Sequence, residues 1–395
     1  MASERTIAIL SAYLGWVMDG YDALLVTPII PLLGSVFFPG PYSYLGGLST
    51  LVATLVMRPL GSVIMGYIGD RAGRRVGLLI TTLGYSLSAL LIAMMPSYYA
   101  IGVAAPIAVL ALRSLQGVFL GGEWGPGTAM IMEWSGWRGE ISSAFAQTGY
   151  PLGALMASLV YSAMSTAMGS GFSTFGWRVY IATGAVAALL AFALRYRSVE
   201  SPLWRRPRRN PLAALFLSRS VDLAYAILMT TGLFFVYYST YLIYSQYLKL
   251  VGMASLTPLI MTASTVAAVL AVFLGGVLSV FLNHKWVFVG SLVVAAALAP
   301  YALILRPTPA SLISLAFIEN LAMGLVPYVL VNKFGVEHRA TGLGISYNWG
   351  LLVGGWAPLL VGLFSSMPLG MVVVMIVGVV IASIGLLALE RTPPS

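Results

Sequence analysis

The chain has 395 residues, of which 59% are hydrophobic and 8% charged, and its mean hydropathy is +0.93. Soluble proteins carry about 25% charged residues, so this composition excludes a soluble domain and indicates a membrane protein with many spans. The net charge of +9 lies in loops between apolar runs, which argues for membrane orientation and against nucleic-acid binding. The absence of cysteine rules out disulfides and thiolate metal sites, and the two histidines, His284 and His338, fall in predicted loops. We therefore expect neither a metal nor another cofactor.

Twelve apolar runs are close to or above the about 20 residues that a helix needs to cross a bilayer. The first begins within a few residues of the N-terminus and is too long for a signal-peptide core, so we expect no cleaved signal. The chain is therefore predicted to be an all-α polytopic membrane protein. In order, the predicted spans are Thr6–Leu33, Gly46–Ile68, Val76–Met95, Ala100–Met132, Ile141–Met168, Trp177–Leu194, Asp222–Tyr247, Thr257–Leu282, Trp286–Leu305, Ser311–Val331, Ala340–Ser365 and Pro368–Leu389.

A basic, proline-containing segment divides these spans six and six. We predict two halves, 1–196 and 221–395, joined by a cytoplasmic linker, 197–220, that lies on anionic headgroups. Most other loop lysines and arginines fall on the same side as this segment, so both termini are predicted to be cytoplasmic, at the plasma membrane. The arginines of the basic segment are Arg195, Arg197, Arg205, Arg206, Arg208, Arg209 and Arg219.

Asp19 and Asp22 lie on one face of the first span, and Arg58 and Arg113 lie at similar depth in the second and fourth. A charge at this depth costs about 2.5 to 3.5 kcal/mol on insertion scales. Each carboxyl can therefore exchange a proton with its surroundings, or form a permanent ion pair with one of the arginines. Both interpretations stay open from the residues alone.

The densest charge cluster, between the second and third spans, is Gly66-Tyr67-Ile68-Gly69-Asp70-Arg71-Ala72-Gly73-Arg74-Arg75. Its glycines allow two helix ends to approach closely, and its aspartate can accept hydrogen bonds from exposed N–H groups. An ungapped match lies 210 residues downstream, at Gly276–Lys285, where Val280 replaces Asp70. We predict a latch on the cytoplasmic side, stronger in the first half, in which Glu133 pairs with Arg71, Arg74 or Arg138. The predicted gating residues are Gly66, Asp70, Arg71, Gly73, Arg74, Arg75, Glu133 and Arg138.

Two further glutamates lie inside predicted spans. Glu123 on the fourth span either protonates or packs between glycine-lined helices. Glu319, next to Asn320 on the tenth span, is a functional candidate because an isolated glutamate at membrane depth is costly without a role.

Aromatic residues gather on two spans of the second half. We expect Tyr237 and Asn348 to line a central cavity, and Tyr244 and Tyr247 to belong to an interfacial belt. The clustered residues are Tyr237, Tyr238, Tyr241 and Tyr244 on the seventh span and Tyr347, Asn348, Trp349 and Trp356 on the eleventh.

The whole chain resembles the major facilitator superfamily. Gly66–Arg75 resembles the signature between helices two and three of that superfamily, and Arg113-Ser114-Leu115-Gln116-Gly117 resembles its helix-four motif. Narrower matches resemble the metabolite:H+ symporters, although Asp19-Gly20-Tyr21-Asp22 is closer to the sialate, lactate and aromatic-acid symporters. Those matches are Arg58-Pro59-Leu60-Gly61, Gly121-Gly122-Glu123-Trp124-Gly125, Gln147-Thr148-Gly149-Tyr150-Pro151-Leu152-Gly153, Arg339-Ala340-Thr341-Gly342, Tyr347-Asn348 and Gly354-Gly355-Trp356-Ala357-Pro358.

The resemblance implies a fold of twelve helices in two halves, and it implies roles for the charged residues. Asp22 would be the proton-coupling acid with Arg113 as its partner, which leaves Arg58 as the substrate anchor. Asp19, Glu123 and Glu319 are further proton-coupling candidates. The predicted substrate-binding residues are Arg58, Arg113, Gln147, Tyr237, Tyr241, Asn320, Asn348 and Trp356.

The expected function is proton-coupled symport of a small organic anion, a carboxylate, by a monomer without a cofactor. A sugar or polyol porter is the alternative, because Glu200-Ser201-Pro202-Leu203-Trp204 resembles the sugar-porter-like branches. A membrane enzyme or a receptor is the rival from another class. The sequence shows neither a nucleophile or metal cluster at one interface nor a loop long enough for a soluble domain.

Overall fold

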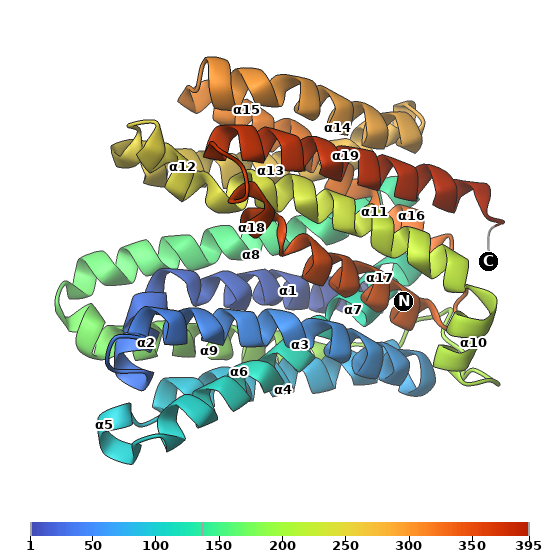
Figure 1. The fold of residues 1–395 in the computed structure, drawn as a ribbon. Helices are drawn as coiled ribbons and strands as arrows, with labels where there is room; N and C mark the ends of the chain where they lie inside the picture. Colours follow the sequence, from blue (N-terminus) through green and yellow to red (C-terminus); the bar gives the residue numbers. More distant parts are fainter. Residues whose placement is uncertain (1, 136–137, 394–395) are drawn as a thin grey trace.

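The protein is described here by a computed structural model that covers residues 2–135 and 138–393. The described residues form helices and loops only, in two bundles that lie one above the other in Figure 1. Eleven helical segments are long and apolar enough to cross a membrane. The broken segment of residues 339–361 completes the predicted twelve spans. Residues 136–137 of the loop after the fourth span lie outside the described residues.

The first half places its six spans where the sequence predicts them. The fourth span is broken after Gly121, and the first is broken by a turn of 3-10 helix. The elements are α1 (Ala2–Leu25), η1 (Thr27–Ile29), α2 (Ile30–Phe37), α3 (Ser43–Ala72), α4 (Arg74–Met94), α5 (Tyr98–Ile101), α6 (Ala104–Gly121), α7 (Trp124–Trp134), α8 (Gly139–Met168), the π-helix η2 (Phe172–Gly176) and α9 (Trp177–Tyr196).

The second half follows the linker helix α10 (Pro211–Ser218) and repeats the plan. Its seventh, tenth and eleventh spans are broken. The elements are α11 (Ser220–Ser239), η3 (Tyr241–Ile243), α12 (Tyr244–Leu250), η4 (Ala254–Leu256), α13 (Thr257–Phe281), α14 (His284–Pro300), the π-helix η5 (Tyr301–Leu305), α15 (Pro309–Asn320), η6 (Ala322–Leu325), α16 (Val326–Val331), α17 (Arg339–Gly354), α18 (Ala357–Val361) and α19 (Met367–Arg391).

Close helix contacts join the two halves, α3 against α17 and α8 against α13. Small residues permit these contacts, because a Cβ on Gly66 of α3 would lie 2.7 Å from Cα of Thr341 on α17. In the same way, a Cβ on Gly276 of α13 would lie 2.5 Å from the carbonyl oxygen of Glu140. The two halves therefore meet backbone to backbone at these points.

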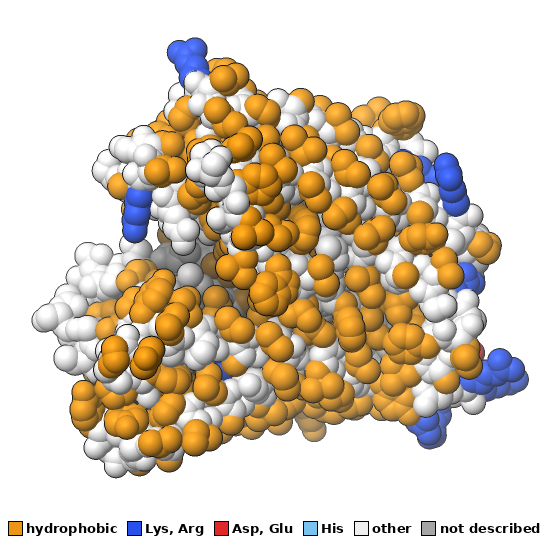
Figure 2. All heavy atoms as spheres, viewed as in Figure 1, with side chains coloured by type: hydrophobic (Ala, Val, Ile, Leu, Met, Phe, Trp, Pro, Cys, Tyr) orange, Lys and Arg blue, Asp and Glu red, His pale blue; other side chains and the backbone are white. Residues whose placement is uncertain are grey.

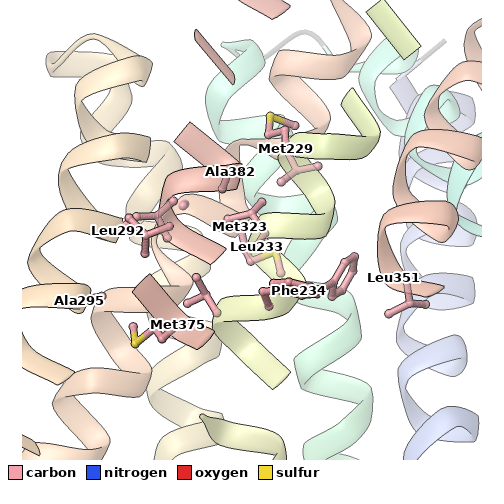
Figure 3. Packing of buried hydrophobic residues seen from close by; sticks show 14 of the residues in the cluster. Met229, Leu233, Phe234, Leu292, Ala295, Met323, Leu351, Met375 and Ala382 are labelled. Atoms are coloured by element: carbon pink, nitrogen blue, oxygen red, sulfur yellow. The ribbon is translucent and has the colours of Figure 1, made fainter. Parts of the chain in front are cut away.

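The largest apolar core fills the second half and reaches Trp16 and Trp124 of the first, a second core lies within the first half, and the outside is also apolar. Figure 3 shows Met229 and Leu233 of α11 packed towards Met375 and Ala382 of α19. The face seen in Figure 2 is covered largely by hydrophobic side chains, as a lipid-facing surface should be.

Tyr244 and Tyr247 belong to the core of the second half, so the expected interfacial belt is wrong for both. Neither is exposed, and their hydroxyls donate to the carbonyl oxygens of Leu312 (3.2 Å) and Leu303 (2.9 Å). Each phenol finds an internal acceptor, which removes the need to reach the headgroup region.

The two ends of the bundle differ. Both termini and α10 lie at one end, called the linker end, whereas α5 and α12 lie at the other, called the far end (Figure 1). Figure 2 shows the surface hollowed between the two halves at the far end. The hydrogen bonds described below join the halves at the centre and at the linker end.

Candidate functional site

Two acids of α1 occupy the centre of the bundle. Asp19 is fully buried, and Nη2 of Arg58 donates to both of its carboxylate oxygens, at 2.8 and 2.9 Å. Asp22 is 3% exposed and accepts a hydrogen bond from Nε2 of Gln116. Oε1 of Gln116 in turn accepts from Nη1 of Arg113 at 2.5 Å. The sequence-based pairing therefore differs from the structure, which places an amide between Asp22 and Arg113 and engages Arg58 with Asp19.

Close packing of α3 on α6 positions both arginines: the backbone of Arg58 faces Gly121, and the carbonyl oxygen of Arg113 accepts from the hydroxyl of Thr54 (3.1 Å). A Cβ on Gly61 would lie 1.9 Å from the carbonyl oxygen of Val118, and one on Gly121 would lie 2.0 Å from that of Arg58. Only glycine fits at both positions. Gly61 of the motif Arg58-Pro59-Leu60-Gly61 therefore allows the backbones of the two helices to touch.

Arg58 also joins the two halves. Its Nε donates to Oδ1 of Asn348 on α17, at 3.3 Å, and Nδ2 of Asn348 lies 3.0 Å from the carbonyl oxygens of both Gly121 and Gly344. Asn348 is fully buried. The group Asp19–Arg58–Asn348, called here the central bridge, therefore depends on how the halves are placed.

An aromatic cluster borders the central bridge. Trp124 stacks on Tyr347 with centroids 4.1 Å apart, and Trp16 lies 5.8 Å from Tyr347 and 5.2 Å from Tyr150. Gln147 holds the pair, because its Nε2 donates to the hydroxyl of Tyr347 (3.3 Å) and its Oε1 accepts from Nε1 of Trp124 (3.1 Å). Sequence reasoning missed Trp16 as a site residue, although it precedes Asp19 by one helical turn.

The other predicted substrate residues lie in the second half. Tyr237 stacks on Tyr241 with centroids 5.3 Å apart, and Glu319 lies against Thr240. Nδ2 of Asn320 donates to the carbonyl oxygen of Ala316 within its own helix, and Trp356 is 58% exposed at the break before α18. Tyr237 also lies beside Tyr238, with centroids 5.4 Å apart, and the phenol of Tyr238 faces Arg58 of the central bridge.

Glu123 forms a buried ion pair with Arg195, whose Nη1 lies 3.0 Å from Oε2 of the glutamate. Arg195 also donates to the carbonyl oxygens of Ser11 (3.1 Å) and Leu78 (2.9 Å). The assignment of Arg195 to the surface linker is therefore wrong, because α9 continues to Tyr196 and turns this side chain inward. The pair ties four spans of the first half together.

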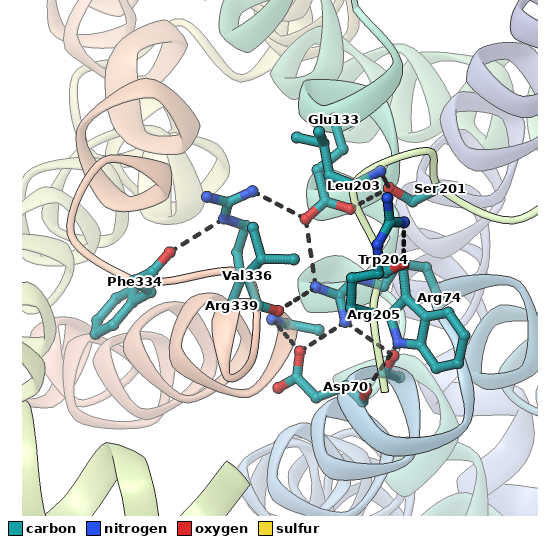
Figure 4. Close-up of polar contacts among 12 residues, drawn as sticks. Asp70, Arg74, Glu133, Ser201, Leu203, Trp204, Arg205, Phe334, Val336 and Arg339 are labelled. Atoms are coloured by element: carbon teal, nitrogen blue, oxygen red, sulfur yellow. Dashed lines mark hydrogen bonds and ion pairs between the residues drawn. The ribbon is translucent and has the colours of Figure 1, made fainter. Parts of the chain in front are cut away.

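Polar contacts close the linker end (Figure 4). Asp70 accepts hydrogen bonds from the amides of Ala340 (3.0 Å) and Thr341 (2.9 Å) and from the hydroxyl of Thr341 (2.6 Å). These groups form the N-terminus of α17, where free amides and the helix dipole favour a carboxylate. The acceptor thus belongs to one half and its donors to the other.

Arg74 and Glu133 extend this network. Arg74 donates to Asp70 (2.8 Å), to Glu133 (3.3 Å) and to the carbonyl oxygen of Val336 (2.6 Å), and Arg339 donates to Glu133 at 2.9 Å (Figure 4). Of the three expected partners of Glu133, the structure shows Arg74, and Arg339 is an additional one from the second half.

The remaining predicted gating residues lie around this network. Arg71 donates to the hydroxyl of Tyr67 on its own helix at 2.9 Å, and Arg138 is exposed. Arg75 donates to the carbonyl oxygen of Tyr196 at 2.6 Å. A Cβ on Gly66 would lie 2.7 Å from Cα of Thr341, so this glycine allows α3 to approach α17.

The start of the linker is docked on the same network. Glu200 accepts from the amides of Arg74 (3.0 Å) and Arg75 (3.1 Å), and Nε1 of Trp204 donates to the carbonyl oxygen of Asp70 at 2.8 Å (Figure 4 shows the tryptophan). Gly73 has a φ of +119°, and a Cβ there would lie 2.3 Å from a Glu200 oxygen. Glycine is thus required here for two reasons: the positive φ disfavours other residues, and a Cβ would clash with Glu200. The sequence alone gave no sign of this docking, because 126 residues separate Arg74 from Glu200.

The other contact between the halves is the one that α8 makes with the second half. Among its described residues, no acid takes the place of Asp70. Where α8 meets the second half, the hydroxyl of Ser143 donates to the carbonyl oxygen of Gly324 (2.7 Å) and accepts from the amide of Tyr328 (2.9 Å). Val280, at the position that matches Asp70, has no polar side-chain atom. The charged network described above therefore lies on one side of the interface.

Comparison with known proteins places this geometry in a family. The model of the Major Facilitator Superfamily matches residues 6–358. The chain is similar to the proline/betaine transporter of Salmonella typhimurium, with 26% identity over 89% of this chain and 76% of that protein. It is also similar to the shikimate transporter of Escherichia coli, with 32% identity over 59% and 54% of the two chains.

An inner membrane metabolite transport protein of Escherichia coli is 29% identical over 52% of this chain and 48% of its own length. The chain thus spans about half the length of several curated relatives that it matches. The solved structure of the proton:xylose symporter XylE bound to 6-bromo-6-deoxy-D-glucose superposes with a TM-score of 0.80 at 20% identity, covering 100% and 97% of the chains. The family model and the shared fold agree. This chain belongs to the major facilitator superfamily.

Proposed function

We propose that the protein is a secondary active transporter that carries a small organic anion together with protons. The halves 1–196 and 221–395 would rock about a central site, with segment 197–220 as their connection. The basic linker and the loop charges orient the linker end towards the cytoplasm. The names of the similar proteins, which include transporters of shikimate and of proline and betaine, support this class of function.

The central bridge is the observation that carries the proposal. It joins a buried acid and arginine of one half to an amide of the other, so the hydrogen bonds of this ion pair depend on conformation. Two acids, Asp19 and Asp22, face two arginines, Arg58 and Arg113, and the four charges cancel when all are ionised. One proton on an acid leaves a net charge of +1, which an anionic substrate would neutralise. The proton and the anion therefore favour each other's binding.

Asp22 is the preferred coupling acid in this proposal. Asp19 shares hydrogen bonds with a guanidinium, whereas Asp22 reaches Arg113 only through Gln116. Protonation of Asp22 therefore breaks no direct ion pair. The substrate carboxylate would then bind Arg58 or Arg113, whose planar forks suit a carboxylate. Asp19 would tune the site, and the ion pair of Glu123 favours a structural role for that glutamate.

The conformation fits one stage of such a cycle. Asp70, Arg74 and Glu133 bind the second half at the linker end, while the far end is hollowed (Figure 2). With the linker end in the cytoplasm, this is an outward-facing state whose cytoplasmic side is latched. Opening requires that Asp70 leave the N-terminus of α17.

A zwitterion with a quaternary ammonium group is the second candidate substrate. Aromatic faces attract such cations, and Trp16, Trp124, Tyr150 and Tyr347 border the central bridge. A neutral sugar is less favoured, because it needs neither of two buried guanidinium groups. The likeness to a xylose symporter concerns the fold alone.

Uptake into proteoliposomes tests this proposal. The assay uses purified protein in liposomes with an inside-alkaline pH gradient, and protein-free liposomes are the control. The labelled substrates are radiolabelled shikimate, glycine betaine and D-xylose, each tested separately. We expect shikimate to accumulate and a protonophore to abolish the accumulation. Accumulation of D-xylose alone, or of none of the three above the control, would contradict the proposed substrate class. Accumulation of glycine betaine alone would favour a zwitterion as the substrate.

A further inference from the structure

A buried acid also lies in the second half. Glu319 occupies the last turn of α15, and its side chain is 3% exposed. Its carboxyl oxygens lie 2.9 and 3.1 Å from the hydroxyl of Thr240. Thr240 sits at the break between α11 and η3, with φ −118° and ψ −89°. The acid thus lies where two spans are interrupted at the same depth.

Among the described residues, no cation compensates Glu319. Thr240 provides its hydrogen bonds, and α13, which packs on α15, has no ionisable side chain. On α14 the cations are confined to its first turn, where they contact Glu390 at the linker end. The ionisable side chains that face Glu319 from the seventh span are the phenols of Tyr237 and Tyr244. An ionised Glu319 would be a buried charge without a counter-ion, which is costly.

The hydrogen bonds favour a neutral acid as well. A threonine hydroxyl has one hydrogen, and Thr240 Oγ1 also lies 2.8 Å from the carbonyl oxygen of Val236. If Glu319 were ionised, this hydrogen would have to serve both the carbonyl and the carboxylate. A protonated Glu319 instead donates to Thr240, and Thr240 donates to Val236. Each of the two hydroxyl hydrogens then has an acceptor of its own.

We propose that Glu319 binds a proton in this conformation and forms a second, exchangeable proton site in the second half. The site would release its proton when the broken spans rearrange, an inference that rests on the proposed alternating access. The breaks after Ser239 and Asn320 are the points at which the surroundings of the carboxyl can change. A carrier with proton sites in both halves would move more than one proton per cycle.

Infrared titration of the protein in lipid nanodiscs tests this site without any substrate. The carbonyl stretch of a protonated carboxyl is compared in the wild type, Glu319→Gln and Glu337→Gln, an exposed acid on a loop that serves as the matched control. We expect a protonated-acid band that Glu319→Gln lacks, that Glu337→Gln keeps, and that converts reversibly to carboxylate as pH rises. Thr240→Val should shift the band, because it removes the hydrogen-bond acceptor.

Two results would overturn the inference. One is a wild type whose acid band equals that of Glu319→Gln, which would mean that Glu319 is ionised. The other is a band that persists at every pH at which the protein stays folded, which would mean that the proton is fixed. If Glu319→Gln does not fold, an unshifted acid band in Thr240→Val contradicts the assignment on its own. The infrared titration involves no substrate, so it still tests the proton site if the uptake assay fails.

Discussion

At the residue scale, the partners of the buried charges carry most of the information about mechanism. The sequence placed Asp19, Asp22, Arg58 and Arg113 inside their spans, because position within an apolar run is read directly from the chain, and the structure buries all four. It could not predict which acid meets which arginine, since that depends on helix rotation and on Gln116. Depth is a local property of the chain, whereas pairing is a property of the packed bundle.

The ion pair of Arg58 predicts a stability effect. Arg58→Gln leaves Asp19 buried without its cation, so we expect a loss of about 3–5 kcal/mol in the free energy of unfolding. The double variant with Asp19→Asn should recover most of this loss, because the uncompensated charge is gone. Thermal denaturation in detergent measures both, with the exposed Arg306→Gln as a control. Equal stability of Arg58→Gln and the control would show that the pair contributes nothing.

We expect the stability of the folded protein to depend on pH through the buried side chain of His338. Burial, with Arg219 and Arg339 nearby, holds the pKa of His338 below its usual value of 6.5. Below about pH 6.5 the unfolded chain therefore binds a proton that the folded protein does not, and stability falls as pH falls. His338→Asn should lose less thermal stability than the wild type between about pH 7.5 and 5.5. Identical losses in the two proteins would contradict this.

At the scale of elements, helix termini and helix breaks position the site. Glycines could be recognised in the sequence as points of close helix approach, and Gly61, Gly66, Gly121 and Gly125 have that role. The docking of Glu200 and Trp204 on α3 and α4 could not be recognised, because nothing local links a linker to a distant helix end. Glu123 shows the same limit, since its partner Arg195 looked like part of a basic surface segment.

The contact of Asp70 with the N-terminus of α17 predicts a change in access. Ser62 of α3 is 1% exposed next to Gly344 of α17, and the chain has no native cysteine. Ser62→Cys should therefore react slowly with a membrane-impermeant maleimide. Adding Asp70→Asn removes a charged acceptor worth about 1.5–3 kcal/mol, so the open population and the labelling rate should rise about 10- to 100-fold.

The control for this labelling is Glu337→Gln in the same Ser62→Cys protein, which should label as slowly as its parent. If Asp70→Asn labels no faster than that control, Asp70 does not hold the linker end closed. Labelling in inside-out vesicles compared with right-side-out cells also reports which face the linker end occupies.

At the scale of the whole molecule, the twelve spans, their six-and-six division and the family could be predicted from hydropathy and motifs. The conformation could not, because one sequence encodes every state of the cycle. In the state described here, the charged network and the central bridge hold the halves together, while the far end is hollowed (Figure 2). Both contacts break if the halves rock apart at the linker end.

The central claim is that Asp22 couples proton binding to substrate binding. The most direct measurement compares wild-type and Asp22→Asn proteoliposomes in two assays with shikimate, accumulation driven by a pH gradient and exchange without a gradient. A neutral amide mimics the protonated acid but cannot release a proton, so we predict that Asp22→Asn loses accumulation and retains exchange. Accumulation by Asp22→Asn against the shikimate gradient would contradict the account.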